Sequence, residues 1–430
     1  MSVASHSLPL PVVVLACLLA FTPAPAAGRA NELVSHGGYA VTREGRVLEA
    51  RALDSAFVPA STIKLVTGLA ALQLLGPDYR FTTTFFVKDR TLYIRGSGDP
   101  GLTSATVAAI AADLARLGLE EVGDIALDAS AFALSGKADG AEGSANPYDT
   151  ANGALAVNYN AVAITVGADG RILPGEEETP LLPLMTEIGR QLGPGTHRVN
   201  PDAFIDGAAL SPTLRYTGEL FQVMLERQGI RVGGRIIAAA VPSGLQPLHF
   251  HTSPQTVADL VRACLHYSSN FIANQLFLTC GAVSLGWPAT WDKGRQALRA
   301  HIATTWPRHR RAITMVEGSG LSRRTRITPA AMLAVLHSFK PYSHLLRAKD
   351  GVPLKTGSLA GVHCYAGYFR RGADLDPFVI LLNQPDNNRD PLLARLQRRH
   401  SAPRSAAVRK YQKKSSFVAG GFEEKKIMED

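Results

Sequence analysis

The chain is poor in cysteine, with four cysteines among 430 residues and no CxxC pair. This composition excludes a disulfide-rich scaffold and gives no support to a thioredoxin-like redox pair or a zinc knuckle. If a signal peptide that ends near Ala26 is removed, Cys264, Cys280 and Cys364 remain. Because an odd count leaves at least one thiol unpaired, we expect free, buried cysteines.

Signatures of several common enzyme classes are also missing. The chain has no P-loop, no GxSxG elbow and no HExxH pair, which removes the usual NTPase, hydrolase-elbow and zinc-protease interpretations. Residues 96–101 formally match GxGxxG, but the rigid Asp99-Pro100 pair inside the loop favours a plain turn. No basic block is interleaved with aromatics, so nucleic acid is not an expected partner, and we expect no metal or cofactor.

The apolar run at residues 9–21 is too short to be a comfortable bilayer-spanning anchor. Small residues follow it at Ala24-Pro25-Ala26, as signal peptidase requires, although His6 is the only basic residue before the run. Cys17 only faintly resembles a lipid-attachment site. We therefore expect a signal peptide at residues 1–27, export to the periplasm, and at most peripheral membrane association.

What the chain does contain is typical of a soluble globular protein of more than one domain. Hydrophobic residues make up 46% and charged residues 19% of a length that exceeds one ordinary domain. The net charge is +9, and residues 401–430 hold seven Lys or Arg against four Asp or Glu. We expect this basic tail to be disordered, and the positive balance to suit an anionic partner such as a carboxylate-bearing cell-wall polymer.

Hydrophobic periodicity predicts the order of the elements. It indicates a hairpin at residues 37–58, a helix from Ser61 to Leu74, and a strand pair at 82–87 and 91–95. A helix at 104–117 then leads into short strands and long Gly-rich loops. A further helix is expected after Ser253-Pro254, with serine as the cap and proline at the first helical position. Apolar segments at 357–369 and 377–382 are typical of strands in a final sheet.

Three short motifs occur in a fixed order: SxxK at residues 61–64, SxN at 268–270 and KTG at 355–357. Alone, each has a structural explanation, namely a capped helix, a helix N-cap and an exposed strand end. Together, and in this order, they are the signature of penicilloyl-serine enzymes. A second SxN at 144–146 lies in a Gly-rich loop, whereas 268–270 lies between two helical segments that would hold it rigidly, so we choose the latter.

The motifs supply the parts of a serine acyl-transfer site. Ser61 and Lys64 are three residues apart on one helix face, so the lysine can deprotonate the serine if burial and a nearby cation lower its pKa. Lys355 is the expected cation. Ser268 would pass a proton to the leaving amine, and Asn270 would hydrogen-bond the substrate amide.

The KTG strand is expected to hold the substrate. Lys355 and Thr356 would bind a terminal carboxylate, and Gly357 would leave room for the substrate against the strand edge. The backbone N–H groups of Ser61 and Ser358 would form the oxyanion hole.

The chain resembles the D-alanyl-D-alanine carboxypeptidase/endopeptidase family of class C low-molecular-mass penicillin-binding proteins, peptidase family S13. The resemblance runs from about residue 37 to 385. Its motifs are residues 59–65 (PASTIKL), 98–100 (GDP), 158–160 (NYN), 268–271 (SSNF), 318–323 (GSGLSR) and 355–358 (KTGS). Ser269 and Glu317 depart from the family pattern, in which both positions are usually aspartate.

The resemblance implies an α+β fold. A β-lactamase/transpeptidase-like catalytic domain, an antiparallel sheet flanked by helices, is expected at residues 28–87 and 250–400. A mostly β accessory region of one or two lobes is expected to be inserted at 88–249. The implied partners are peptidoglycan peptides and β-lactams, and the implied activity is carboxypeptidase, DD-endopeptidase or both, through an acyl-enzyme on Ser61.

Two other functions use the same fold. A serine β-lactamase needs an additional carboxylate to activate water, and residues 300–310, where a class A enzyme places it, contain no Asp or Glu. A catalytically silent wall-binding protein is disfavoured because all five proposed polar groups are present: Ser61, Lys64, Ser268, Asn270 and Lys355.

Overall fold

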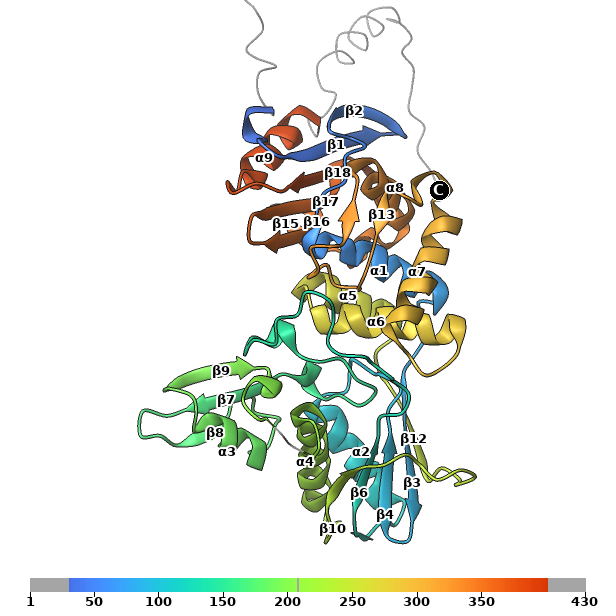
Figure 1. Ribbon diagram of the computed structural model, residues 1–430, viewed down its shortest axis with the longest axis vertical. Helices are drawn as coiled ribbons and strands as arrows, with labels where there is room; N and C mark the ends of the chain where they lie inside the picture. Colours follow the sequence, from blue (N-terminus) through green and yellow to red (C-terminus); the bar gives the residue numbers. More distant parts are fainter. Residues whose placement is uncertain (1–30, 207–208, 401–430) are drawn as a thin grey trace, which may run out of the picture.

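A computed structural model describes residues 31–206 and 209–400. The predicted signal peptide at 1–27 and the predicted basic tail at 401–430 lie outside these residues. The helices and the two larger sheets form an elongated molecule with the chain ends of the described part at one end (Figure 1). Within the described ranges, no helix combines the length and apolar character that a membrane span requires.

A six-stranded antiparallel sheet forms one end of the molecule, in the order β15-β16-β17-β18-β1-β2. The first hairpin, β1 and β2, pairs with the last strand, β18, so the two ends of the sequence close one sheet. This confirms the predicted hairpin, whose turn lies at Glu44-Gly45. The strands are β1 (Gly37–Arg43), β2 (Arg46–Arg51), β15 (Ala348–Lys349), β16 (Val352–Leu359), β17 (Val362–Arg371) and β18 (Asp374–Leu382).

Helices cover both faces of this sheet. On one face, alternate side chains of the strands pack in the main core against helices that come from three parts of the sequence. Helix α9 covers the other face. Cys264, Cys280 and Cys364 are free and buried, as expected from the sequence. The helices are α1 (Lys64–Leu74), α5 (Val257–Tyr267), α6 (Asn270–Leu285), α7 (Trp291–Thr305), α8 (Pro329–Phe339) and α9 (Arg389–His400).

Three element boundaries differ from the sequence prediction. The helix expected at Ser61 begins as a 3-10 turn, η2 (Ala60–Ile63), and becomes α-helical at Lys64. Ser253 and Pro254 do not start a helix, because Thr256 caps α5 and forms a capping box with Asp259. The segment 357–369, expected to be one strand, contains a turn between β16 and β17.

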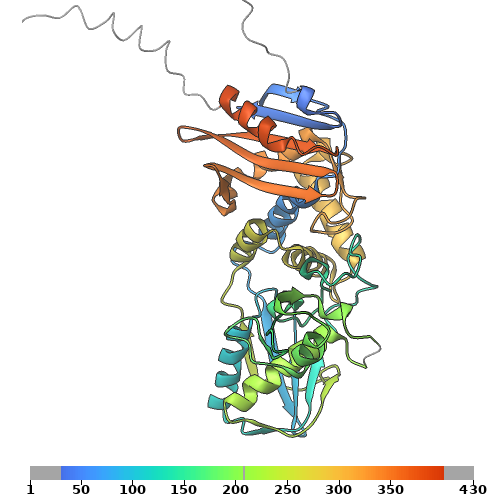
Figure 2. The ribbon, with the colours of Figure 1, turned by 90° about the vertical axis from the view of Figure 1, so that its left-hand side faces the viewer.

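The inserted region forms the other end of the molecule, and α5 and α6 lie between it and the large sheet (Figure 2). Its main sheet has the order β11-β6-β4-β3-β12, and a smaller sheet has the order β8-β7-β9. The strands are β3 (Thr82–Lys88), β4 (Thr91–Arg95), β6 (Ile125–Asp128), β7 (Val162–Val166), β8 (Ile172–Pro174), β9 (Gly195–Val199), β11 (Ile236–Ala238) and β12 (His249–Thr252).

One hydrophobic core joins these two sheets, since Phe85 and Ile164 belong to the same buried cluster. The predicted helix at 104–117 is present as α2 (Ser104–Arg116). The sequence interpretation omitted two helices that also pack here, α3 (Pro183–Gly189) and α4 (Pro212–Arg227).

The strand pairing gives a reason to move the expected domain boundaries. β3 pairs with β4 and, on its other edge, with β12. A boundary at residue 88 would separate β3 from β4, and a boundary at 249 would leave β12 in the other domain. We therefore propose that the inserted region extends from Thr82 to Thr252.

Candidate active site

Ser61 and Lys64 meet at the start of α1. The η2 turn carries Ser61, and the next residue with its side chain on the same face is Lys64, whose ammonium is fully buried. Lys64 Nζ lies 2.8 Å from Ser61 Oγ, 2.8 Å from Asn270 Oδ1 and 2.7 Å from the Ser319 carbonyl oxygen. The structure thus brings the predicted serine and lysine together and fixes the lysine with three acceptors.

The SxN motif lies across from this pair. Ser268 ends α5 in the left-handed conformation, with φ of 57°, and Asn270 is the first residue of α6. Lys355 Nζ donates to Ser268 Oγ at 2.8 Å, so all three motifs are connected through side chains. The alternative SxN at 144–146 does not take part in these contacts, because Ser144 Oγ donates its hydrogen bond to Asp149.

Both lysines have lowered pKa values. Burial lowers the pKa of Lys64 to about 8, and the nearby Cys264 and Glu317 oppose this shift. Burial also lowers the pKa of Lys355 to about 7, and the charge of Lys64 adds to that effect. Since two ammonium groups share one buried site, a neutral amine next to Ser61 is accessible near neutral pH.

Two glycines allow other segments to approach the Ser61 turn closely. A Cβ added to Gly357 would lie 2.6 Å from the Pro59 carbonyl oxygen, and one added to Gly320, with φ of +82°, would lie 2.1 Å from the Ala60 carbonyl oxygen. The structure thus gives Gly357 a packing role besides the expected room for substrate, which stays a prediction. This glycine lets β16 pack against the backbone that carries Ser61.

Gly357→Ala is expected to destabilise the protein by about 1–3 kcal/mol, because the added methyl group must displace β16 or the η2 turn. The melting temperature should fall, and the rate of serine acylation should fall with it. Gly193→Ala is the matched control, since no atom lies within 4 Å of the added Cβ. An unchanged melting temperature in Gly357→Ala would contradict the packing role.

Ser61, Ser268, Asn270 and Ser358 line one cavity of about 790 Å³. Lys64 and Lys355 are buried beneath its wall, with side chains 0% and 2% exposed. Thr356 does not line this cavity and faces a neighbouring one. Four of the predicted site residues thus line one cleft, and the two buried lysines supply its charge from below.

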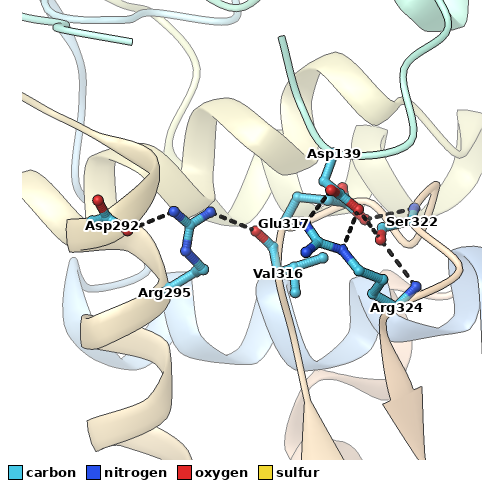
Figure 3. Close-up of polar contacts among 7 residues, drawn as sticks. All are labelled: Asp139, Asp292, Arg295, Val316, Glu317, Ser322 and Arg324. Carbon is cyan, nitrogen blue, oxygen red and sulfur yellow. Dashed lines mark hydrogen bonds and ion pairs between the residues drawn. The ribbon is translucent and has the colours of Figure 1, made fainter. Parts of the chain in front are cut away.

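The inserted region closes one side of this cavity. Asp139, from the loop after β6, accepts hydrogen bonds from Ser322 Oγ and from Arg324, with which it forms an ion pair (Figure 3). Figure 3 also shows Arg295 between Asp292 and the Val316 carbonyl oxygen, at 2.6 and 3.3 Å. The contacts of Asp139 hold the loop against the segment that follows Glu317, whereas Arg295 joins α7 to Val316, just before that segment.

A model of the D-Ala-D-Ala carboxypeptidase 3 (S13) family matches residues 33–190 and 206–354. The chain belongs to this family. The match spans the SxxK and SxN motifs and most of the inserted region, whereas the KTG motif at 355–357, β17, β18 and α9 lie beyond it.

The relatives below have low sequence identity to this chain, but the matches cover most of its length. The D-alanyl-D-alanine carboxypeptidase DacB of Haemophilus influenzae is 24% identical over 368 residues, covering 72% of this chain and 76% of the relative. The D-alanyl-D-alanine carboxypeptidase of Actinomadura sp. is 26% identical over 404 residues, covering 76% and 73%. The crystal structure of penicillin binding protein 4 from H. influenzae superposes with a TM-score of 0.67 at 20% identity, covering 83% of this chain and 92% of that one. A structure of the same protein complexed with a β-lactam gives a TM-score of 0.64.

The two departures from the S13 pattern have structural roles. Ser269 caps α6, because its Oγ accepts a hydrogen bond from the N–H of Ile272. Glu317 is fully buried, and its carboxylate accepts from the Ser319 N–H and hydroxyl at 2.6 Å each and from the Gly320 N–H at 2.7 Å. Glu317 thereby shapes the turn whose Ser319 carbonyl binds Lys64.

Sequence reasoning missed this carbonyl contact. The GSGLSR motif marked the segment as part of the family pattern, but a backbone acceptor leaves no side-chain signal. Asn274 and Thr67 hold the same turn, since Asn274 Oδ1 accepts from the Gly318 N–H and Thr67 Oγ1 donates to the Gly318 carbonyl oxygen.

Proposed function

We propose that this S13 protein is a serine D-Ala-D-Ala carboxypeptidase and DD-endopeptidase, which acts on peptidoglycan stem peptides through an acyl-enzyme on Ser61 and is inhibited by β-lactams. The observation that carries the proposal is the contact between Lys64 Nζ and Ser61 Oγ in a buried site that also holds Lys355. A buried lysine in contact with a serine hydroxyl is the arrangement that activates such a nucleophile.

Acylation then proceeds from the neutral form of Lys64. Its amine takes the proton from Ser61 Oγ as the oxygen attacks the carbonyl carbon of the scissile D-Ala-D-Ala bond. The N–H groups of Ser61 and Ser358 stabilise the negative charge on the carbonyl oxygen. When the C–N bond breaks, the proton held by Lys64 passes to the leaving amine through Ser268, which Lys355 holds with a hydrogen bond, and Lys64 is neutral again.

In deacylation, water takes the place of the leaving amine, and Ser61 becomes the leaving group. Water attacks the acyl carbon, a proton passes to Lys64, and Ser61 leaves as the hydroxyl. Asn270 Oδ1 is occupied by Lys64, so its amide N–H₂ group is the part available to a substrate carbonyl. That amide also reaches the Tyr148 carbonyl oxygen at 3.3 Å.

A β-lactamase is the second candidate, because the cavity does contain carboxylates, from Asp139, Glu142 and Asp149. All three lie outside residues 300–310, where a class A enzyme places its carboxylate. Asp139 is paired with Arg324, and Asp149 is 2% exposed and accepts from Ser144. None of the three hydrogen-bonds Ser61 in the described structure, which favours slow hydrolysis of a penicilloyl ester.

The test combines a peptidase assay with the lifetime of the penicilloyl adduct. Purified protein is expected to release D-Ala from a pentapeptide, to cleave cross-linked muropeptides, and to hold labelled penicillin as a stable adduct. Rapid turnover of penicillin would instead establish the β-lactamase. If the protein forms no adduct and has no peptidase activity, the silent wall-binding protein is the function that remains. Intact-mass measurement over time distinguishes these results.

We also propose that the protein is exported to the periplasm. The support is the apolar run at 9–21 followed by Ala24-Pro25-Ala26, together with a substrate that lies outside the cytoplasm. Sequencing the N-terminus of the protein recovered from cells tests whether cleavage occurs near Ala26.

A further inference from the structure

A second cavity, of about 400 Å³, lies at the other end of the KTG strand. Its wall includes Leu354 and Thr356 from β16, Arg347 and Lys349 from the segment before it, and His266 from the end of α5. The first cavity, by contrast, is lined by residues 358–360 at the far end of the same strand. The four-residue KTGS segment therefore connects two separate cavities.

The direction of a bound substrate follows from this arrangement. If Ser358 contributes to the oxyanion hole and Lys355 and Thr356 bind the carboxylate of the leaving residue, the acyl part occupies the first cavity. The leaving part then points along β16 toward Leu354 and the second cavity. β15 pairs with β16 only at Val352 and Pro353, so no described strand covers the edge from Lys355 onward.

The size of the second cavity exceeds what one leaving D-Ala needs. A volume of about 400 Å³ lies in the range of small-molecule pockets, roughly 300–1,000 Å³. A carboxypeptidase that released only single residues would have no use for this space. It suits a leaving group that continues beyond the residue held by Thr356.

The charges of the cavity favour an acidic group. Arg347 is exposed and forms no ion pair with any residue in the described ranges, and the Nε2 atom of His266 is buried without a hydrogen-bond partner. Lys349 is already paired with Asp390 and donates to Tyr365 Oη at 2.7 Å. Asp350 supplies one opposing charge from the turn after β15.

We propose that this cavity is a leaving-group subsite in which Arg347 and His266 bind a second carboxylate, on a peptide leaving group larger than D-Ala. The proposal rests on the function proposed above and assigns its endopeptidase branch to a specific place. A cross-linked stem peptide is such a leaving group, because its released strand carries acidic residues beyond the one next to the scissile bond.

The test uses two synthetic substrates that differ only in charge. Both are N-acyl-D-Ala-D-Lys peptides, one with a succinyl group on the lysine ε-amine and one with the isosteric, neutral succinamoyl group. Wild-type protein is expected to cleave the succinyl substrate with kcat/KM about fivefold higher, as one partly exposed charge contact allows. Arg347→Ala should reduce this ratio to about one, and Arg347→Lys should retain most of it.

The controls separate the subsite from folding and from the chemistry. Penicillin acylation of Ser61 should proceed at the wild-type rate in Arg347→Ala. Arg308→Ala, an exposed arginine that lines neither cavity, should keep the wild-type ratio. His266→Gln provides an independent variant and should also lower the ratio.

A wild-type ratio of one, or an unchanged ratio in Arg347→Ala, would overturn the subsite while leaving the proposed function intact. An equal loss on both substrates would also overturn it, since a charge-selective contact cannot produce that result. If the wild type cleaves neither peptide and forms no adduct with penicillin, the proposed function itself fails and the subsite fails with it.

Discussion

Ser61→Ala is expected to abolish covalent labelling by penicillin and to lower kcat/KM for D-Ala release by about 10⁵-fold or more, because no acyl-enzyme can form without the hydroxyl. Among the described residues, the Ser61 side chain makes one hydrogen bond, which it accepts from Lys64, so the variant should remain folded. Fluorescent penicillin followed by gel electrophoresis measures the labelling, and peptide mapping of the wild-type adduct identifies the modified residue.

The matched control is Ser130→Ala, an exposed serine after β6 that does not line the cavity. It should label like the wild type. Undiminished labelling of Ser61→Ala would refute the mechanism, and peptide mapping would then show which nucleophile carries the penicillin. Retained labelling of the wild type together with loss of the thermal transition in Ser61→Ala would indicate misfolding rather than a chemical role.

Local spacing explains why the sequence could predict part of the site. Lys64 follows Ser61 by three positions, and one helical turn places such side chains together whatever the rest of the fold does. The contact of Lys64 with Asn270, 206 positions away, is different in kind. It followed from the order of the motifs and the family resemblance, because no local rule brings these residues together.

The rest of the site depends on backbone contacts that sequence patterns do not display. The Ser319 carbonyl oxygen binds Lys64 only because the buried Glu317 carboxylate shapes the turn around it. Gly357 was singled out from its motif, but its packing contact was not predicted, since the neighbour of its missing Cβ is the Pro59 carbonyl oxygen. The partner of a glycine is visible only in three dimensions.

The same limit applies to the inserted region. The strand pair β3 and β4 was recognisable from its alternating pattern and a short turn. Its pairing with β12 was not, because His249 meets Phe85 across 164 positions of chain. The boundaries placed at 88 and 249 therefore cut through a sheet whose strands are adjacent only in the folded protein.

Lys64→Ala is expected to lower the rate of penicillin acylation by about 10³-fold, in the range found for loss of a general base. The substitution also removes a buried cation, so Asn270 Oδ1 and the Ser319 carbonyl oxygen lose a donor. A thermal melt and circular dichroism spectrum check that the fold persists. Lys340→Ala, an exposed lysine outside the cavity, should acylate like the wild type.

The pH dependence of acylation tests the role of Lys64 as the base more specifically than the loss of rate in Lys64→Ala does. Burial lowers its pKa to about 8, and the base must be neutral, so wild-type acylation should rise between pH 6 and 8 as the amine loses its proton. Lys355, with a pKa of about 7, shares the site, so the first proton released belongs to the pair. Above both values neither amine is charged, so no cation is left to bind the substrate carboxylate and the rate should fall again. Lys64→Ala should lose the rising limb. A wild-type rate that is flat from pH 6 to 8, or a rising limb that survives in Lys64→Ala, would assign the proton transfer to another group.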